Sequence, residues 1–389
     1  MNDKPTTQVV LKYTYYILLL LILGAGINHL VIHFIDYPVY ELAGLKVLQG
    51  NSMDLYDLQR NTPGGYYYPY FFALMFAPLS LIGYIGKIVF YILFCLSFIK
   101  IINFSVNNSL SLLKEENTKY RYPIYLIVLI SSIYAINDAF MNSNIGIILM
   151  ALSIYSFELK DKRPLIAGML IAAAVVFKIY PAFILCFFVW NKNWKMVTSA
   201  IFFILFFYIG TPIVFNGFSN GILLLKNQYF VLSNFGDHWP LDSIVFQNLT
   251  STMLRFFPSL ELKSVLKPAL ITVLVIFLPS FIKKKKDIKE TFVLKMFFFT
   301  LALTAMLTPV SWYNMALFYT PIIAYTASLA LTKRYVPAIM SFALFFIMFC
   351  LTTPGILGNK INDLLEYYAI PFLGLLIITM FFSTELKKN

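Results

Sequence analysis

The chain has 389 residues, of which 60% are hydrophobic and only 12% are charged. This composition excludes a water-soluble globular protein, because apolar runs of roughly 20 residues, long enough to cross a bilayer, recur along the whole length. The net charge of +12 would suggest nucleic acid as a partner of a soluble protein. Here the basic residues lie between the apolar runs, so they indicate membrane topology and contacts with anionic lipid, and we expect no nucleic-acid partner.

The first apolar run, at about 13–34, follows Lys4 and Lys12 and predicts a retained first span with a cytoplasmic N-terminus. An external loop is expected next, at about 35–68. Asp36 is the first acid after the run. An ionisable side chain at a membrane boundary is costly, so it usually pairs, lines a water-filled cavity or takes part in chemistry.

Basic clusters between the later runs define the rest of the topology, since cytoplasmic loops are rich in Lys and Arg. The result is an all-α polytopic membrane protein of about twelve membrane helices, some short and broken, with both termini cytoplasmic. A second external loop is expected at about 216–264, and we predict a single membrane domain over 1–389. The longer spans after the first are predicted at about 84–104, 121–137, 143–158, 196–215, 265–282, 291–308, 314–331, 335–352 and 366–384.

Two segments predict shorter helices. Tyr70–Gly83 is expected to form a re-entrant or membrane-surface helix. The run Pro164–Trp190 has basic residues at both ends, which predicts two short helices, at about 164–177 and 180–190, with Lys178 at the break. Non-helical backbone at membrane depth is tolerated only where it is buried in protein or faces a cavity. Lys178 is therefore either a contact for a lipid-borne phosphate, or a side chain that snorkels outward or pairs with an acid.

The predicted external side carries other unusual side chains. The run Tyr66-Tyr67-Tyr68-Pro69-Tyr70 closes the first loop and forms either an interfacial aromatic belt or a wall for a sugar ring or prenyl chain. In the second loop, Arg255 could fork onto phosphate oxygens, although a loop arginine is more often solvated. Its neighbours Asp237, His238 and Asp242 remain equally open.

Signals for other chemistries are weak. Cys95, Cys186 and Cys350 all lie in apolar runs, which argues against a disulfide framework or a zinc cluster. His29 and His33 share a helix face and allow a metal, but polar residues facing the bundle interior explain them better. The sequence has no glycine-rich phosphate loop, which argues against a soluble nucleotide-sugar site. We assign no metal or cofactor site, and a divalent-metal requirement stays open.

Four segments follow one another in a recognisable order: Asp36-Tyr37-Pro38-Val39-Tyr40 with Leu55-Tyr56; Tyr68-Pro69-Tyr70 with Ala77-Pro78-Leu79; Arg163–Gly168 with Lys178–Ala182 and Trp194-Lys195; and Leu307-Thr308-Pro309-Val310-Ser311-Trp312. Together they resemble glycosyltransferase family 87, the polyprenol-phosphate-mannose-dependent mannosyltransferases of the GT-C superfamily. The resemblance covers most of the chain up to about residue 330. It implies a multi-helix GT-C fold with its site at the extracytoplasmic membrane face.

The resemblance also implies roles for residues. Asp36 would be the general base, and Lys178 and Arg255 would contact the donor phosphate. The sugar on polyprenyl phosphate is a co-substrate, so no cofactor is implied. Residues expected to line the substrate cavity are Tyr40, Tyr68, Tyr70, Tyr180, Gln247, Trp312 and Asn314.

Two departures from the family pattern bear on which sugar is transferred. Family members usually carry a histidine just after the Ser-Trp of the fourth segment, where this chain has Tyr313-Asn314-Met315. They also tend to have Gly-Gln in the turn between the third and fourth spans, where this chain has Asn142-Ser143-Asn144. Neither departure touches Asp36 or Lys178.

We therefore expect an inverting glycosyltransferase of the inner (plasma) membrane. It would move a sugar, with mannose the first choice, from polyprenyl phosphate to a lipid-linked or cell-envelope glycan outside the cytoplasm. A carboxylate would remove the proton of the acceptor hydroxyl, and a lysine would offset the charge of the departing phosphate. A transporter or flippase of a lipid-linked saccharide would share the cavity and the lysine, whereas a structural scaffold would leave Lys178 unexplained.

Overall fold

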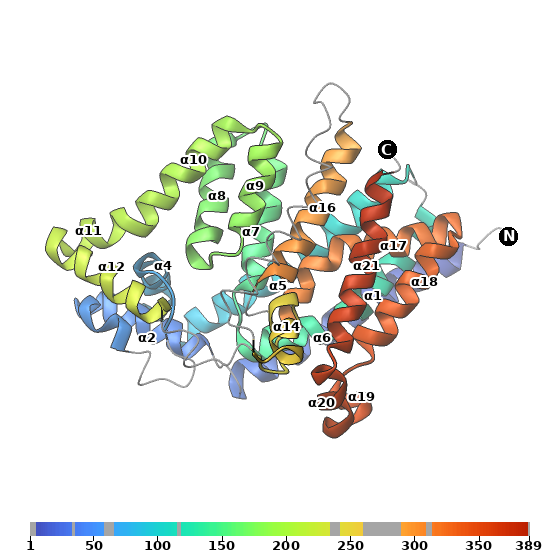
Figure 1. Cartoon of the computed structure of the whole chain (residues 1–389), viewed down its shortest axis with the longest axis horizontal. Helices are drawn as coiled ribbons and strands as arrows, with labels where there is room; N and C mark the ends of the chain where they lie inside the picture. The colour runs from blue at the N-terminus through green and yellow to red at the C-terminus, as the bar shows by residue number, and fades with distance from the viewer. Residues whose placement is uncertain are drawn as a thin grey trace. The chain divides into compact units, whose positions relative to one another are not determined.

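The computed structural model shows helices and no strand in the part of the chain that it describes (Figure 1). The helices form two compact units, each assembled from segments that are far apart in sequence. Unit 1 comprises Met1–Gly24, Ile99–Asp138 and Leu241–Asn389, and unit 2 comprises Ala25–Phe98 and Ala139–Pro240. The residues described are 5–32, 36–57, 66–114, 118–233, 242–259, 289–308 and 313–387.

Several predicted features lie outside the described residues. They include the span expected at about 265–282 and the end of the fourth motif, so the placement of Trp312 remains a prediction. The histidine pair cannot be placed either, because neither side chain is among those described. The features concerned are 265–282, His29, His33, Asp237, His238 and Trp312.

Three helices contribute residues to both units: α1 (Pro5–Ile32), α5 (Tyr84–Leu112) and α6 (Thr118–Asn142). Each is apolar over more than 18 residues and qualifies by length and composition as a membrane span. They correspond to the spans predicted at about 13–34, 84–104 and 121–137, although α5 runs eight residues beyond the expected end. The end of α5 contains Asn and Ser residues, and it remains helical beyond the predicted apolar span.

In unit 2, the described part of the loop predicted at about 35–68 is largely helical. It contains α2 (Tyr37–Leu48) and a 3₁₀ helix, η1 (Ser52–Asp57). Pro38 lies in the first turn of α2, where its fixed φ suits a helix and its missing N–H costs no hydrogen bond. Gly44 then allows α2 to pack against α4 (Tyr70–Leu81), since a Cβ there would come within 3.0 Å of Ala77 N.

The helices on either side of Lys178 confirm the predicted break. α8 (Pro164–Phe177) ends at Lys178, whose backbone is extended, and α9 (Ala182–Trp190) begins after Pro181. Proline has no N–H to continue the hydrogen bonding of α8, and it suits the start of a new helix. The short helix expected from Tyr70 is also present as α4. The remaining helical elements of unit 2 are α7 (Gly146–Leu159), α10 (Trp194–Leu205), η2 (Phe206–Gly210), α11 (Thr211–Asn216) and α12 (Phe218–Ser233).

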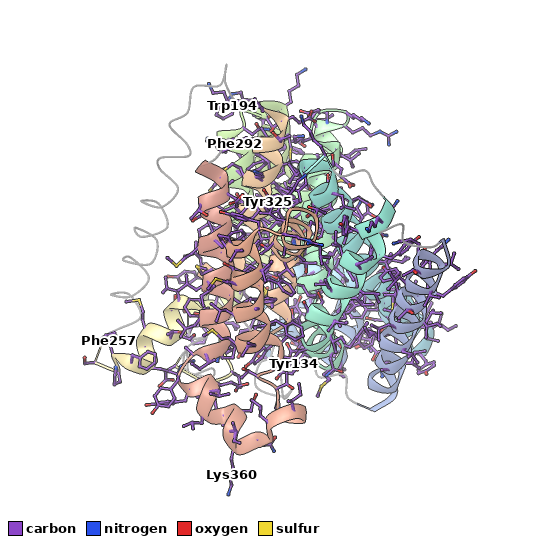
Figure 2. The ribbon with its side chains drawn as sticks, turned by 90° about the vertical axis from the view of Figure 1, so that its right-hand side faces the viewer. Tyr134, Trp194, Phe257, Phe292, Tyr325 and Lys360 are labelled. Atoms are coloured by element: carbon purple, nitrogen blue, oxygen red, sulfur yellow. The ribbon has the colours of Figure 1, made fainter. Side chains whose placement is uncertain are left out.

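Unit 1 is a bundle with a heavily buried centre. The apolar helix α16 (Glu290–Leu307) and the continuous segment of η4 (Tyr313–Tyr319) and α17 (Thr320–Lys333) are enclosed by other helices over most of their length. Phe292, near the start of α16, and Lys360, in α20 (Asn359–Tyr367), lie at opposite ends of this unit (Figure 2). The other helical elements are α14 (Leu249–Phe256), α18 (Val336–Phe345), η5 (Phe346–Cys350), α19 (Pro354–Leu357) and α21 (Ile370–Lys387).

The chain is a multi-pass membrane protein. Six helical segments in the described part are long and apolar enough to cross a membrane, and a pair bent by 53°, Asn359–Tyr367 with Ile370–Leu386, makes up to seven. Four further apolar helices are only 10–17 residues long. The expected total of about twelve, the cytoplasmic placement of both termini and the single-domain organisation remain predictions.

α8 and α10 lie side by side in unit 2 and approach closely at Gly168 (Figure 1). A Cβ at Gly168 would come 2.6 Å from both the Met196 carbonyl oxygen and the Ser199 Cβ. We expect Gly168→Ala to separate the two helices and to destabilise the protein by about 1–3 kcal/mol, the usual cost of overpacking.

Thermal unfolding in detergent measures this effect. Gly24→Ala is the matched control, because a Cβ there meets nothing within 4 Å and alanine favours the helix. An equal melting temperature for Gly168→Ala and the wild type would contradict the close packing.

Candidate functional site

Asp36 is held in place immediately before α2. Its backbone N–H donates to the Asn142 carbonyl at 3.2 Å, and its own carbonyl accepts the N–H groups of Val39 and Tyr40, each at 3.1 Å. These bonds hold the residue at the N-cap position of α2. Its carboxylate does not cap the helix and instead accepts a hydrogen bond from the Tyr40 hydroxyl at 3.2 Å.

Tyr40 is the best-packed residue of this site. Its side chain is fully buried, and its ring meets Phe72 and Phe76 edge-on at centroid distances of 4.9 and 5.1 Å. Its hydroxyl lies 2.8 Å from the Tyr68 hydroxyl as well as 3.2 Å from Asp36. Aromatic packing therefore holds the hydroxyl in place, and the hydroxyl orients the carboxylate.

Lys178 reaches the same group of side chains from the break between α8 and α9. Its Nζ donates to Asn144 Oδ1 at 3.1 Å and lies 5.7 Å from the centroid of the Tyr68 ring, within cation–π range. Asp36, Tyr40, Tyr68, Lys178 and Asn144 thus form one continuous set of contacts inside unit 2, which we call the acid–lysine cluster.

The turn between α6 and α7 contacts both charged members of this cluster. Asn142 accepts the Asp36 N–H through its carbonyl, and Asn144 accepts the Lys178 ammonium through its side chain. Asn144 Oδ1 also accepts the Gly146 N–H at 3.0 Å, which fixes the amide. This turn was noted in the sequence only as a departure from the family pattern, so Asn144 was missed as a site residue. An amide following an apolar span was the available signal.

Burial controls the electrostatics of Asp36. Removal of the carboxylate from water raises its pKa above the ordinary value for aspartate, because the charged form loses hydration. The positive charge of Lys178 and the hydrogen bond from Tyr40 act in the opposite direction and lower the same pKa. A carboxyl group with a raised pKa is a stronger base once it is ionised, which suits proton abstraction.

Tyr70 and Tyr180 were also expected at the site. Both are buried: Tyr70 begins α4, two residues after Tyr68, and Tyr180 follows Lys178 by two residues. Of the six predicted site residues in unit 2, four are joined in the acid–lysine cluster: Asp36, Tyr40, Tyr68 and Lys178. Tyr180 acts electrostatically on Tyr68, and Tyr70 follows Tyr68 by two residues along the chain.

Arg255 belongs to unit 1, near the end of α14, and its side chain binds main-chain carbonyl groups. Its Nη1 donates to the carbonyls of Ser243 and Phe246 at 2.8 and 3.0 Å. Its Nη2 lies 3.4 Å from the Thr252 hydroxyl, and only 9% of the residue is exposed. Arg255 thus ties the segment before α14 to the helix, and its predicted contact with a donor phosphate stays a prediction.

Gln247 lies in a buried polar group around Glu366 of α20. Its Nε2 donates to the carbonyls of Ile244 at 2.6 Å and of Glu366 at 3.2 Å. The Glu366 carboxylate accepts from the Tyr313 hydroxyl at 2.6 Å and from Asn362 at 2.7 Å. Sequence reasoning missed Glu366, although an acid at the start of the last predicted span, about 366–384, was visible.

Asn314, at the position where family members carry histidine, binds an acid that the sequence analysis overlooked. Its backbone N–H and its side-chain Nδ2 both donate to Asp138 Oδ2 at 2.8 Å. Asp138 lies near the end of α6, and a carboxylate inside an apolar helix is a functional signal in its own right. Asn314 is 3% exposed, so this contact is interior to unit 1.

Comparison with known families identifies the chain. The model of glycosyltransferase family 87 matches residues 66–354, most of the sequence. The chain belongs to glycosyltransferase family 87. No curated protein and no solved structure matches it significantly.

Family membership makes this protein a glycosyltransferase, and it favours a transferase over a transporter or flippase. The match contains Tyr68 and Lys178 but begins after Asp36 and Tyr40. The structure joins these parts, because the Tyr40 hydroxyl contacts Tyr68 on one side and Asp36 on the other. The Asp36 N–H also donates to the Asn142 carbonyl, so Asp36 contacts the matched region directly.

The contacts of Arg255 generate a stability prediction. We expect Arg255→Met to leave the buried Phe246 carbonyl without this donor, whereas the half-buried Ser243 carbonyl keeps the Phe246 N–H. The free energy of unfolding should fall by about 1.5–3 kcal/mol. Hydrogen exchange should rise in the segment 242–256, because Arg255 no longer holds the turn to α14.

Arg255→Lys is the matched control. It keeps the positive charge, but it lacks the planar guanidinium through which Arg255 reaches both carbonyls. If Arg255 has a structural role, hydrogen exchange in the segment 242–256 should be faster in both variants. Unchanged exchange together with weaker donor binding in Arg255→Met alone would show that the residue serves the phosphate.

Proposed function

We propose that this glycosyltransferase transfers a sugar from a polyprenyl-phosphate donor to a lipid-linked or envelope glycan, at the extracytoplasmic face of the plasma membrane. Mannose is the sugar that the family resemblance favours. The observation that carries the proposal is the acid–lysine cluster, which brings a half-buried carboxylate and an ammonium group together through Tyr40 and Tyr68. A transfer with an activated phosphate leaving group requires these two charges and little else.

The proposed reaction is a single displacement at the anomeric carbon. Asp36 takes the proton of the acceptor hydroxyl, whose oxygen forms the new bond to the sugar. The bond between the sugar and the phosphate oxygen breaks, and polyprenyl phosphate leaves with the electron pair. The attack comes from the face opposite to the leaving group, so the anomeric configuration inverts.

Lys178 would offset the negative charge that develops on the departing phosphate. Its ammonium is held by Asn144 on one side and by the face of Tyr68 on the other, so it is oriented before the donor arrives. A preorganised charge is effective because the protein does not reorganise during the reaction.

An exposed apolar side chain supports the lipid character of the donor. Ile179, next to Lys178 at the helix break, is 83% exposed. A donor that carried its phosphate on a soluble nucleotide would gain nothing from an isoleucine beside the phosphate contact. A prenyl chain would cover it, since apolar surface is stabilised by hydrocarbon.

The first test of this mechanism is Asp36→Asn. The amide cannot accept the acceptor's proton, so we expect turnover to fall by about 10²–10⁴-fold, the contribution of a general base. The assay measures release of polyprenyl phosphate and glycosylated acceptor by purified protein.

Asp57→Asn serves as the control, because Asp57 lies in the same predicted loop and is exposed. We expect it to retain wild-type turnover. An Asp36→Asn protein that folds normally and keeps its activity would rule out Asp36 as the base.

The second test uses pH. The pKa of Asp36 is raised, so activity should be lost on acidification at a pH above the ordinary aspartate value of about 4. We call this loss the acidic limb of the profile of activity against pH. Lys178 lowers that pKa, so Lys178→Met removes an opposing effect and should move the acidic limb to still higher pH.

Lys178→Arg keeps the charge and should leave the acidic limb near its wild-type position. The position of the limb is independent of the overall loss of rate that both variants suffer. If the acidic limb does not move in Lys178→Met, the charge of Lys178 does not affect the pKa of the catalytic base.

A further inference from the structure

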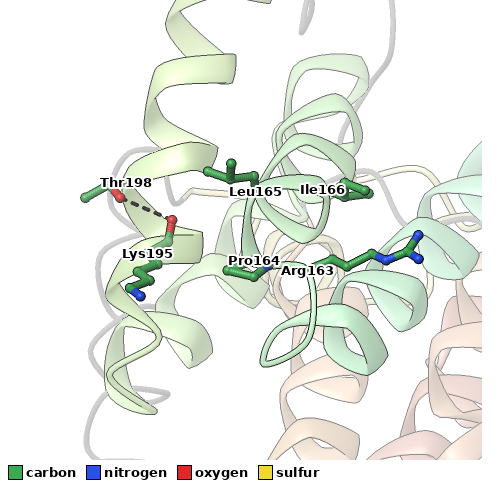
Figure 3. A pocket seen from close by; sticks show the side chains of 6 residues that line it. All are labelled: Arg163, Pro164, Leu165, Ile166, Lys195 and Thr198. Atoms are coloured by element: carbon green, nitrogen blue, oxygen red, sulfur yellow. Dashed lines mark hydrogen bonds between the residues drawn. The ribbon is translucent and has the colours of Figure 1, made fainter.

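The other end of α8, away from the acid–lysine cluster, has a feature that the proposed reaction does not use. A cavity of about 530 Å³ opens between the starts of α8 and α10 in unit 2 (Figure 3). It is lined from α8 and the residue before it by Arg163, Pro164, Leu165 and Ile166, and from α10 by Lys195 and Thr198. The 14 residues of α8 separate it from Lys178 by roughly 20 Å at the rise of an α-helix.

The walls of the cavity are held together by specific contacts. The close approach of α8 and α10 at Gly168 brings Ser199 to the Leu165 carbonyl, to which its hydroxyl donates at 3.0 Å. The Thr198 hydroxyl bonds to its own helix, at the carbonyls of Trp194 and Lys195. The cavity is therefore a fixed feature of two packed helices.

The charge of this end of unit 2 is strongly positive. The segments 158–163 and 191–195 contain five basic and two acidic residues. One acid, Asp161, is already paired with Lys160 at 2.8 Å. Among the described residues, no carboxylate lies within 4.0 Å of Arg163 or Lys195, so both remain available to an anion.

Apolar side chains complete the lining. Leu165 is 67% exposed and Ile166 is 40% exposed. Trp194, at the start of α10, is 56% exposed, as is common for tryptophan at the level of lipid headgroups. A ligand that carries one negative charge next to a hydrocarbon chain matches this combination.

We propose that the cavity binds an anionic phospholipid. Arg163 and Lys195 flank the lining on opposite sides, with their charged ends pointing away from each other (Figure 3). The phosphodiester would lie between these two positive charges, and its acyl chain would run along Leu165. Basic pockets between membrane helices commonly hold lipid headgroups in this manner. The proposal is independent of the transfer reaction, which uses neither Arg163 nor Lys195, although both belong to segments that the sequence singled out.

Binding of phosphatidylglycerol to the purified full-length protein tests the proposal, with phosphatidylcholine as the neutral reference. Native mass spectrometry counts the bound lipids, and a titration that follows the melting temperature gives the affinity. Two lost charges in Arg163→Gln/Lys195→Gln should weaken phosphatidylglycerol binding by roughly 30-fold. Binding of phosphatidylcholine should change little.

The double variant Lys162→Gln/Lys192→Gln is the matched control. It removes two charges from the same loops, and both side chains are exposed and do not line the cavity. We expect it to bind phosphatidylglycerol like the wild type. An equal loss in the two double variants would indicate diffuse surface attraction and overturn the site.

Inorganic phosphate provides the second arm of the test. If the site recognises a lipid, phosphate at millimolar concentration should not displace phosphatidylglycerol, and Leu165→Ser should weaken the lipid severalfold. Displacement by free phosphate, or a Leu165→Ser variant that binds normally, would show a phosphate site in place of a lipid site. Unchanged binding in Arg163→Gln/Lys195→Gln would refute both.

Discussion

The hydroxyl of Tyr40 is the contact on which the proposed chemistry depends. It connects the Asp36 carboxylate to Tyr68, and the Tyr68 ring in turn lies beneath the Lys178 ammonium. The surrounding phenylalanines fix the tyrosine ring, so a small apolar core sets the position of the half-buried Asp36 carboxylate. Without this support, two ionisable groups in a poorly hydrated site would each lose solvation without gaining a defined partner.

Much of the helical architecture could be predicted from the sequence, because bilayer thickness imposes a minimum length on an apolar helix. The break at Lys178 was predictable for a related reason, since basic residues at both ends of one apolar run forbid a single crossing. The helices inside the expected loops were not. α2 and α14 are short and only partly apolar, so no length rule applies, and they form because they pack against neighbours such as α4 and α16.

The candidate site was likewise only partly predictable from the sequence. Asp36 and Lys178 stand out as charges beside apolar runs, and family resemblance suggests their roles. Their shared contact with the Asn142–Asn144 turn depends on how separate segments fold together, which no local pattern contains. Arg255 shows the opposite situation: guanidinium chemistry suggested a phosphate, whereas its observed partners are carbonyls of its own segment. Glu366 and Asp138 were visible as acids near apolar helices, but only the fold shows which amides and hydroxyls they bind.

The extent of the family match has a consequence for how such proteins are recognised. In this chain the matched region, residues 66–354, includes Lys178 but not Asp36. The match by itself therefore says nothing about Asp36. For another member of the family, the side chain at this position has to be read from the sequence that precedes its match.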